Sequence, residues 1–425
     1  MNRAVGTWMK PAFFDEGYEK NPGVAAEGPL VPEPIGDAEA INTVKSFMDD
    51  EWRKLIRPPL GALKFPYIAP GATYSDLWDW DTFFVGCAVP DDGLEYAKGG
   101  IMNLLDGPLK DDRPSKKATD DGEYDYYLHP YPLRAQFAYV VGKRLGDFTW
   151  IEPFLEKILV GIKWYERATQ DQDGFFRWQT LTGIDNNPSI YGRPPGMVAG
   201  VDLAVFHYRE YRALARLMAL FGRSEGTEFC EKAEALKVLM QTRFWDEIDG
   251  FFYDIDRNID YHVPGRQKIT WDTYLKFRNG SGLYPLWGGV ATPEQAERLK
   301  ILIMDEAEFL APCGTRTHSR RDPVYNNAIS GGPSNWQGPV WGLNTFLTAY
   351  GLARYGYRAE AREIAMRLIR TFAWDIRQNG CLHEYYHGDT GQPLIKPGFL
   401  DWNMLALKVL DDISLRADCT SQDLV

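Results

Sequence analysis

The amino-acid sequence predicts an all-α protein whose helices pair and close into a toroid. Long segments with apolar residues at helical spacing recur along most of the chain. Strand-like alternation is scarce and confined to short stretches such as Phe251–Ile255. Loops that are alternately short and long, and rich in glycine, proline and aromatic residues, separate the helical segments. Ten or more helices connected in this way indicate helix pairs arranged in a ring.

The helical segments are recognised by apolar residues that return at every third or fourth position. Leu133, Phe137 and Val141, for example, share one helical face. By spacing, length and apolar content, helices are expected at 38–56, 132–145, 151–168, 201–221, 229–240, 339–355, 358–374 and 401–415. The word Asp-Gly-Phe-Phe occurs at 173–176 and again at 249–252, each time after a long helix. This echo favours one repeated unit of helix, turn and loop.

The chain is expected to hold one large domain. A length of 425 residues suits two or three average domains or a single large helical ring. Residues 1–40 are rich in proline, glycine and acidic residues and are expected to form an extended N-terminal arm. No linker or composition break follows residue 60, so residues 41–425 are expected to form a single domain.

Composition excludes several classes of function. The formal net charge is −12, from 47 basic and 59 acidic residues, which argues against a nucleic-acid partner and against docking on an anionic membrane. The five cysteines are scattered, odd in number and without a CxxC pair, so free thiols in a reducing compartment are expected. The N-terminus lacks the apolar core of a signal peptide, and no run approaches 18 apolar residues. A soluble cytoplasmic protein is expected, of undetermined oligomeric state.

Aromatic residues are numerous and many adjoin short polar residues. The chain has 14 Trp, 23 Tyr and 22 Phe. Aromatic faces flanked by polar side chains suit sugars, although a large core could also account for any single one. In the segment 74–84, Tyr74, Trp78 and Trp80 are candidates to wall a sugar and Asp81 to accept its hydrogen bonds. A plain N-cap at the start of a helix is the alternative for Asp81.

Two further loops present polar and aromatic groups together. In Gly183-Ile-Asp-Asn-Asn-Pro-Ser189, Asp185 is held rigidly beside Asn186, and a protonated Asp185 would donate to a leaving oxygen. An Asx-turn is an equally good interpretation of this loop. The third segment runs from Ser334 to Trp341 and offers Trp336, Gln337 and Trp341 as substrate contacts.

The fourth segment supplies a second carboxyl group. Glu384 and Tyr385 lie in 382–391, which is followed by Gly398-Phe-Leu-Asp-Trp402, and Glu384 is a candidate base that activates water. Glu384 with neighbouring histidines and an aspartate also invites a metal site, but glycines make this segment a loop, so no metal or other cofactor is expected. Glycoside hydrolysis needs two carboxyl groups on opposite faces of the scissile bond, and in a helical ring the inter-helix loops converge at one mouth.

These motifs resemble glycoside hydrolase family 63 and its trehalase and glucoamylase-like relatives, over about 75–410. The resemblance rests on their order: LWDWDTFF (77–84), GIDNNPS (183–189), NWQGPVW (335–341), HEYYHGDTG (383–391) and GFLDW (398–402). It implies an (α/α)6 barrel, a toroid of six helical hairpins with long inter-helix loops, as the catalytic domain. It also implies inversion at an α-linked sugar without a metal, with Asp185 as acid and Glu384 as base.

The resemblance further implies the roles of binding residues. Trp80 and Asp81 match the pair that contacts the sugar in the first subsite, and Trp336 and Gln337 match a second wall of that pocket. Trp402, from GFLDW, completes the substrate-binding candidates.

Within this family the short chain looks most like the bacterial mannosylglycerate and glucosylglycerate hydrolases. Their substrate is a small anionic compatible solute, so a local cation is expected, either Arg193 or an arginine of the 316–321 loop, although a surface charge is the alternative for each. The insertion 106–131 departs from the family pattern and suits a lid. The alternatives are a trehalase or other α-glucosidase acting on a neutral sugar, and a catalytically inactive sugar-binding protein.

Overall fold

The computed structural model describes residues 35–415 except 72–73, 75, 128–129, 181–182, 258, 261–267, 270 and 329–333. Most of the expected N-terminal arm, residues 1–34, therefore lies outside the described residues. The first helix starts at Asp37, within one residue of the expected start at 38.

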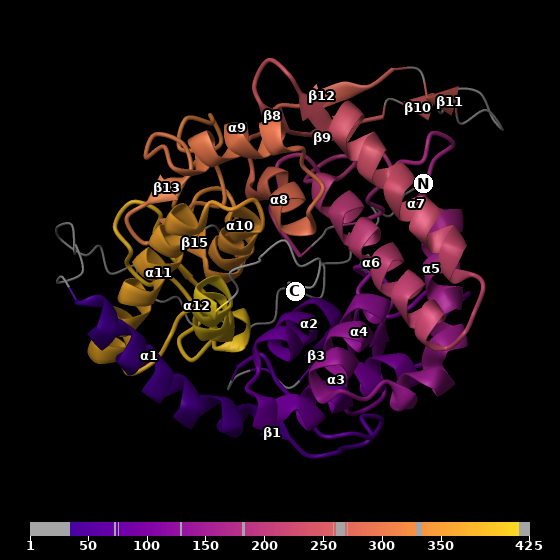
Figure 1. Ribbon diagram of the computed structural model, residues 1–425, viewed down its shortest axis with the longest axis horizontal. Helices are drawn as coiled ribbons and strands as arrows, with labels where there is room; N and C mark the ends of the chain where they lie inside the picture. Colours follow the sequence, from indigo (N-terminus) through magenta and orange to yellow (C-terminus); the bar gives the residue numbers. More distant parts are fainter. Residues whose placement is uncertain are drawn as a thin grey trace, which may run out of the picture.

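The described chain is dominated by helices. These are α1 (Asp37–Glu51), α2 (Asp79–Ala88), α3 (Leu94–Asp106), α4 (Arg134–Leu145), α5 (Leu155–Thr169), α6 (Val201–Leu220), α7 (Gly226–Leu239), α8 (Tyr284–Gly288), α9 (Pro293–Ile303), α10 (Gly342–Arg354), α11 (Arg358–Asn379) and α12 (Leu405–Leu415). Figure 1 shows them following one another round a centre, from indigo to yellow. The ring closes where α1 packs on α11 and α12 packs on α2.

Inner and outer helices differ in how much of their surface is buried. Helix α10 is buried on every side from Gly342 to Ala353. By contrast, α1 buries only the stripe Ala40, Val44 and Met48, which lies on one helical face. The pairs α6 with α7 and α10 with α11 each join a largely buried helix to one with an exposed face. No helix among the described residues is long and apolar enough to cross a bilayer.

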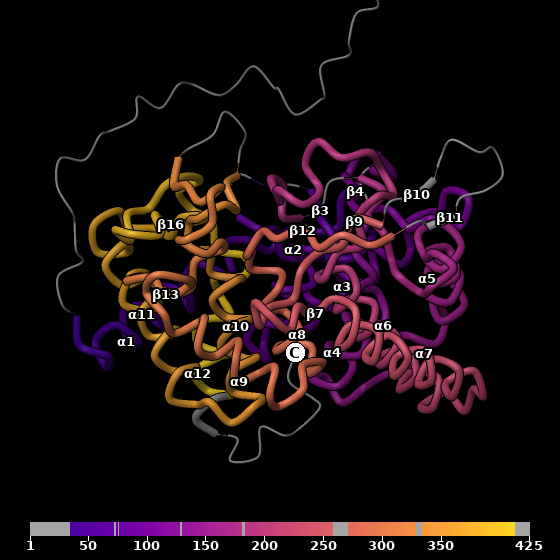
Figure 2. Tube along the Cα trace, turned by 90° about the horizontal axis from the view of Figure 1, so that it is seen from above, coloured from indigo at the N-terminus to yellow at the C-terminus, as the bar shows by residue number. Residues whose placement is uncertain are grey.

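The strands are short and tie loops together. They are β1 (Ile56–Arg57), β2 (Tyr67–Ile68), β3 (Leu77–Trp78), β4 (Lys117–Ala118), β5 (Tyr124–Asp125), β6 (Val198–Ala199), β7 (Trp245–Asp246), β8 (Phe251–Phe252), β9 (Asp254–Asp256), β10 (Ile259–Asp260), β11 (Lys268–Ile269), β12 (Thr273–Leu275), β13 (Leu310–Ala311), β14 (Gly314–Thr315), β15 (Val340–Trp341) and β16 (Tyr385–Tyr386). The described pairings are antiparallel and join β3–β4–β5, β6–β9–β12 and five separate pairs. Figure 2 shows β3, β4, β9, β12 and β16 toward the same side of the ring.

Most expected helices are present, with differences at their ends. The segments expected at 201–221 and 358–374 correspond to α6 and to α11, which runs on to Asn379. The helix expected at 339–355 starts later, at Gly342, because the two preceding residues form β15. Helices α2, α3, α8 and α9 were not identified by the spacing of apolar residues.

The first aromatic motif is placed at the start of α2. This helix begins at Asp79 with Trp78 in the N-cap position, so Asp81 lies inside the first turn and does not cap the helix. A carboxylate there faces the positive end of the helix dipole. The N-cap interpretation of Asp81 was therefore wrong by three positions, because Trp78 is the N-cap residue.

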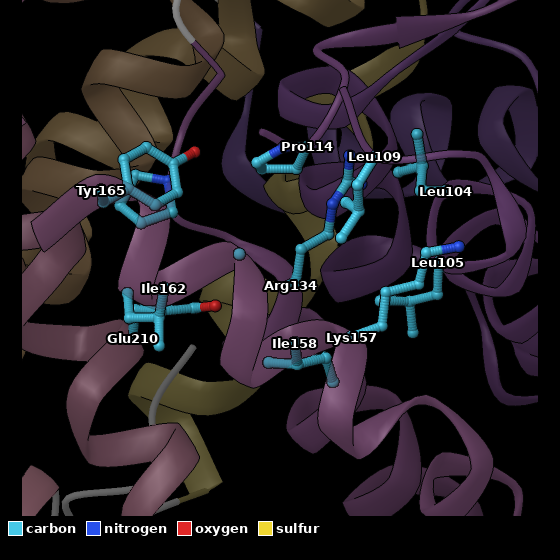
Figure 3. Close-up of a pocket in the computed structure, with 12 residues that line it drawn as sticks. Leu104, Leu105, Leu109, Pro114, Arg134, Lys157, Ile158, Ile162, Tyr165 and Glu210 are labelled. Atoms are coloured by element: carbon cyan, nitrogen blue, oxygen red, sulfur yellow. The ribbon is translucent and has the colours of Figure 1, made fainter. Parts of the chain in front are cut away.

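The insertion 106–131 is fastened to this motif and to α4. Strand β4 pairs with β3, and Arg134 Nη2 donates to the Ser115 carbonyl oxygen at 2.6 Å. Figure 3 shows Arg134 pointing toward Pro114 and Leu109 beside a cavity of about 20 Å³. That volume is room for about one water molecule and far too little for a sugar.

Candidate active site

Helix α2 presents two carboxyl groups on either side of Trp80. The Asp79 carboxylate is buried and accepts hydrogen bonds from the backbone N–H groups of Trp80 at 2.7 Å and Tyr131 at 3.2 Å. The Trp80 ring stacks on Tyr131 with centroids 4.2 Å apart. Asp79 therefore anchors the motif, and the charge of the half-buried Asp81 contributes to the raised pKa values of Asp185 and Glu384.

The loop that carries Asp185 is fixed from both ends. Before it, the Gly183 N–H donates to the Tyr131 hydroxyl at 3.0 Å. After it, Asn187 Nδ2 donates to buried Asp254 at 3.4 Å. Asp185 itself is exposed, and its Oδ2 accepts a hydrogen bond from the hydroxyl of buried Ser334. The acid candidate is thus accessible on a rigid loop.

Asn186 joins this loop to the loop at 334–341. Its Oδ1 accepts from the Trp336 N–H at 2.7 Å, and its Nδ2 donates to Asn335 Oδ1 at 3.1 Å. Gln337 Nε2 donates to the Asn186 carbonyl oxygen at 2.8 Å. Both amides that were expected to bind substrate therefore hold the two loops together, and a contact of either with substrate stays a prediction.

Strand pairing brings the Glu384 loop to the same place. In the β15–β16 pair, Trp341 lies opposite Tyr385, the residue after Glu384. The Trp341 ring stacks on Trp336 at 3.9 Å and on Tyr385 at 4.6 Å. These three rings form one aromatic stack that spans two of the motifs.

The last motif adds a carboxyl group that the sequence analysis did not select. The Asp401 N–H donates to the Pro70 carbonyl at 2.9 Å, and Phe399 bridges to Gly71. Asp401 is buried and has a φ of +20°, and burial together with the nearby charge of Asp81 raises the pKa of its carboxyl group. Two carboxyl groups that interact in this way disfavour a second negative charge, so the pair favours the state in which one of them is protonated.

The four carboxyl groups act on one another. Burial, then the charges of Asp185 and Asp81, raises the pKa of Glu384 to about 8. Although Asp185 is accessible to solvent, the surrounding protein desolvates its carboxyl group and raises its pKa, against which the Ser334 hydrogen bond acts. Burial and the Asp81 charge hold the pKa of Asp401 well above its ordinary value. The four groups are therefore coupled electrostatically, and ionisation of one disfavours ionisation of the others.

Buried indole groups near these carboxyls have unused donors. The Nε1 atoms of Trp80, Trp336 and Trp402 are enclosed and have no hydrogen-bond partner among the described residues. A buried N–H without an acceptor costs free energy, and a sugar hydroxyl would supply the acceptor. The outer candidates are half-buried, with Tyr74 edge-on to Phe399 at 6.2 Å and Trp78 under Lys117 Nζ at 5.0 Å.

The candidate arginines are engaged with protein groups. Arg193 Nη1 donates to the carbonyls of Pro188 at 3.1 Å and Ser189 at 3.0 Å, which braces the Asp185 loop. In the 316–321 loop, buried Arg316 Nη2 pairs with Asp389 at 3.0 Å. The exposed Arg320 and Arg321 pair with Asp389 at 3.5 Å and with Asp305 at 3.7 Å.

The histidines of the fourth motif have local partners. His383 Nδ1 lies 2.9 Å from Asp375 Oδ2, and His387 Nδ1 accepts from the Asp389 N–H at 3.1 Å. Within the described ranges, no three histidine, cysteine or acidic side chains are grouped closely enough to hold a metal ion. These contacts shape the loop that presents Glu384.

Ser334→Ala is expected to change the pH dependence of catalysis. The lost hydrogen bond favours ionised Asp185, so the pKa of Asp185 rises and an acid at this position keeps its proton to higher pH. The alkaline limb of kcat/KM should move upward, measured beside Ser319→Ala, whose hydroxyl donates to Glu308 instead. A downward shift would contradict the assignment.

The chain is similar to known glycoside hydrolases in sequence and in fold. The sequence profile of the mannosylglycerate hydrolase MGH1-like glycoside hydrolase domain matches residues 74–400. The GH63 mannosylglycerate hydrolase from Thermus thermophilus, in complex with glucose, superposes with a TM-score of 0.65 at 19% identity, covering 87% of this chain and 99% of that chain. Another structure of that hydrolase, at a TM-score of 0.64, holds Tris and D-glycerate. Neutral trehalase from Saccharomyces cerevisiae gives a TM-score of 0.61 at 17% identity, covering 84% and 74%.

Sequence relatives include trehalases. The probable trehalase of Eremothecium gossypii is 26% identical over 461 aligned positions, which cover 88% of this chain and 60% of the relative. The chain thus spans about 60% of that relative's length. Because the profile match covers most of the chain and contains the motifs that hold Asp81, Asp185, Trp336 and Glu384, the chain belongs to the mannosylglycerate hydrolase MGH1-like family of glycoside hydrolases.

Proposed function

We propose that this chain is an inverting α-glycoside hydrolase that cleaves glucosylglycerate or mannosylglycerate. One observation carries the proposal. Asp185 accepts a hydrogen bond from Ser334, and the loop of Ser334 leads to Trp341, which pairs with Tyr385, the residue after Glu384. Loops far apart in the sequence are therefore neighbours, which supports one site for both carboxyl groups, as does the effect of the Asp185 charge on the pKa of Glu384. Two carboxyl groups from different loops, with a polar, aromatic site around them, are what glycoside hydrolysis needs.

Each carboxyl group has a defined task in this mechanism. Protonated Asp185 gives its proton to the glycosidic oxygen as the bond from the anomeric carbon to that oxygen breaks. Ionised Glu384 takes a proton from a water molecule as the water oxygen bonds to the opposite face of the anomeric carbon. The products are the β-anomer of the sugar and the free hydroxy acid. Proton exchange with solvent then restores both groups.

The binding residues and the fold complete the proposal. Trp80, Trp336 and Trp402 donate their unused N–H groups to sugar hydroxyls, and Asp81 accepts from them. The ring of helices, one inner and one outer in each pair, supports an (α/α)6 barrel formed by residues 41–425 as one catalytic domain. The free thiols of Cys87, Cys230, Cys313 and Cys381 support a cytoplasmic location.

A neutral α-linked disaccharide is the second candidate substrate. The trehalase relatives at about a quarter identity favour it. The same acid and base would serve, so the two candidates differ only in the leaving group. A sugar-binding protein without turnover is a poorer explanation, because both carboxyl groups are present with raised pKa values.

Side-by-side hydrolysis of glucosylglycerate, mannosylglycerate, trehalose and kojibiose tests the proposal. Proton NMR should show the β-anomer first, from one of the two glycerate conjugates. Release only from a neutral disaccharide would replace the substrate and keep the mechanism. Early release of the α-anomer, or no turnover, would contradict the acid–base assignment.

A further inference from the structure

Lys116 lies on the wall of the site, in the insertion 106–131. The Asp79 N–H donates to the Lys116 carbonyl at 2.9 Å, next to the β3–β4 pairing. Arg134 Nη2 donates a hydrogen bond to the carbonyl oxygen of the preceding residue, Ser115, at 2.6 Å. The backbone of Lys116 is therefore fixed beside the start of α2 and cannot swing away as a free loop would.

The Lys116 ammonium group lies between two of the catalytic motifs. The residue is only 5% exposed, and its Nζ is 6.0 Å from the centroid of the Tyr131 ring. Tyr131 stacks on Trp80 at 4.2 Å, and its hydroxyl accepts from the Gly183 N–H at 3.0 Å. Tyr131 therefore links Lys116 to Trp80, the residue before Asp81, and to the loop that carries Asp185.

The donors of this ammonium group are unused within the described part of the chain. Lys116 Nζ makes no hydrogen bond there and no ion pair within 4.0 Å, whereas neighbouring Lys117 Nζ donates to Asp76 at 2.7 Å. A lysine whose side chain is nearly buried, but whose ammonium group has no hydrogen-bond acceptor in the described protein, points to a ligand that supplies the acceptor. The positive charge of Lys116 lowers the pKa values of Asp81 and of Asp185, the proposed acid.

We infer that Lys116 binds the carboxylate of the leaving group and makes the enzyme selective for glycosides of 2-hydroxy acids. The inference rests on the proposed function, with Asp185 as the acid. In such a glycoside the carboxylate is bonded to the same carbon atom as the glycosidic oxygen. A cation that binds the carboxylate must therefore be a neighbour of the acid that protonates the oxygen, as Lys116 is.

Other cations are less suitable. Arg193 and Arg316 already donate to backbone carbonyls at 3.0–3.1 Å. Lys396 acts on Glu384, whose pKa it lowers, and in an inverting enzyme the base lies on the face opposite the leaving group. A carboxylate bound at Lys116 would also oppose the loss of a proton from Asp185, so the bound substrate would help to keep its own acid protonated.

A pair of substrates that differ only in charge tests this inference. α-Glucosylglycerate and α-glucosylglycerol share the sugar and the linkage, but the second carries a hydroxymethyl group in place of the carboxylate. The wild type should prefer the charged substrate. Lys116→Gln should lower kcat/KM for glucosylglycerate roughly 10- to 100-fold, the cost of a charged hydrogen bond. The kcat/KM for the neutral substrate should fall roughly tenfold less than that for glucosylglycerate, because the neutral substrate has no carboxylate to bind.

Controls separate this role from a structural one. Lys110→Gln removes an exposed lysine of the same insertion and should leave the substrate preference unchanged. Thermal unfolding checks that Lys116→Gln is folded. If it is not, Lys116→Arg decides, because a displaced charge lowers the preference at least about threefold if residue 116 contacts the carboxylate.

Three results would overturn the inference. They are equal losses on both substrates in Lys116→Gln, a wild type without charge preference, and an unchanged preference in a folded Lys116→Arg when Lys116→Gln is unfolded. A wild type that cleaves both conjugates equally leaves the proposed acid–base mechanism intact. Cleavage of trehalose alone would instead overturn the leaving group of the proposed function, and the inference with it.

Discussion

Glu384→Gln is expected to lower kcat for any α-glycoside by roughly 10³-fold or more, because the water nucleophile loses its base. A glutamine fits the same space but cannot accept the proton. The loss should be as large with an α-glycosyl fluoride, since attack by water is required whichever group leaves. Steady-state rates measured beside Glu247→Gln, on a carboxylate whose side chain is 84% exposed, control for the loss of one charge.

The same variant should be at least as stable as the wild type. Folding raises the pKa of Glu384 from 4.5 to about 8, so the folded state binds its proton more tightly than the unfolded state does. Below pH 4.5 the carboxyl is protonated in both states and folding gains nothing from ionisation. As pH rises from 4.5 to about 8, ionisation favours the unfolded chain, so stability declines over this window.

Glutamine removes that decline. The unfolding free energy of Glu384→Gln should therefore depend less on pH between 4.5 and 8 than that of the wild type, measured by denaturant titration at several pH values. An inactive variant that is also less stable at pH 8 would assign Glu384 a structural role. An active variant would remove it from the mechanism altogether.

The sequence predicted the helices whose apolar residues form a stripe. Helix α1, with Ala40, Val44 and Met48 on one face, is such a case. Helix α2 was missed because all but one of its ten residues are buried, and a helix enclosed on every side has no stripe. Helix α9 did carry a signal, a capping box of Thr292 and Gln295 with a proline at its start, which apolar spacing alone does not detect.

The sequence predicted which motifs contain the residues of the candidate site, but not the contacts among those residues. The motifs contain Asp81, Asp185 and Glu384, which the structure brings into one electrostatic group. The sequence could not predict the effect of the Asp81 charge on the pKa of Asp401, because the position of Asp401 depends on Phe399 bridging to a segment more than 300 residues away. Residues that act through tertiary contacts leave no periodic signal.

The position of the insertion 106–131 in the fold also could not be predicted from the sequence. Its departure from the family pattern suggested a lid, and Lys116 is one of several charged residues in it. The structure pairs β4 with β3, which makes the insertion part of the wall beside α2. The role of this lysine follows from the register of two-residue strands, which is too short a pattern to detect in a sequence.

Asp185→Asn is expected to distinguish the two carboxyl groups by the leaving group they need. Hydrolysis of a glycerate conjugate should fall roughly 10²- to 10⁴-fold, because the leaving alkoxide receives no proton. Fluoride leaves as a weak base and needs little protonation. The variant should therefore hydrolyse the α-fluoride of the released sugar within roughly tenfold of the wild-type rate, and still release the β-anomer.

Asp185→Asn also allows the ionisation of Glu384, the proposed base, to be followed separately in the pH dependence of kcat/KM. With the fluoride substrate only Glu384 must be ionised, so kcat/KM rises with pH through the pKa of Glu384. That pKa is about 8 in the wild type, partly because the Asp185 charge raises it. Asparagine removes the charge, so the rising limb should move to lower pH, whereas loss of fluoride hydrolysis or a limb at higher pH would contradict the pairing of these two residues. A shift downward, together with retained fluoride turnover, would identify Asp185 as the acid and Glu384 as the base in one experiment.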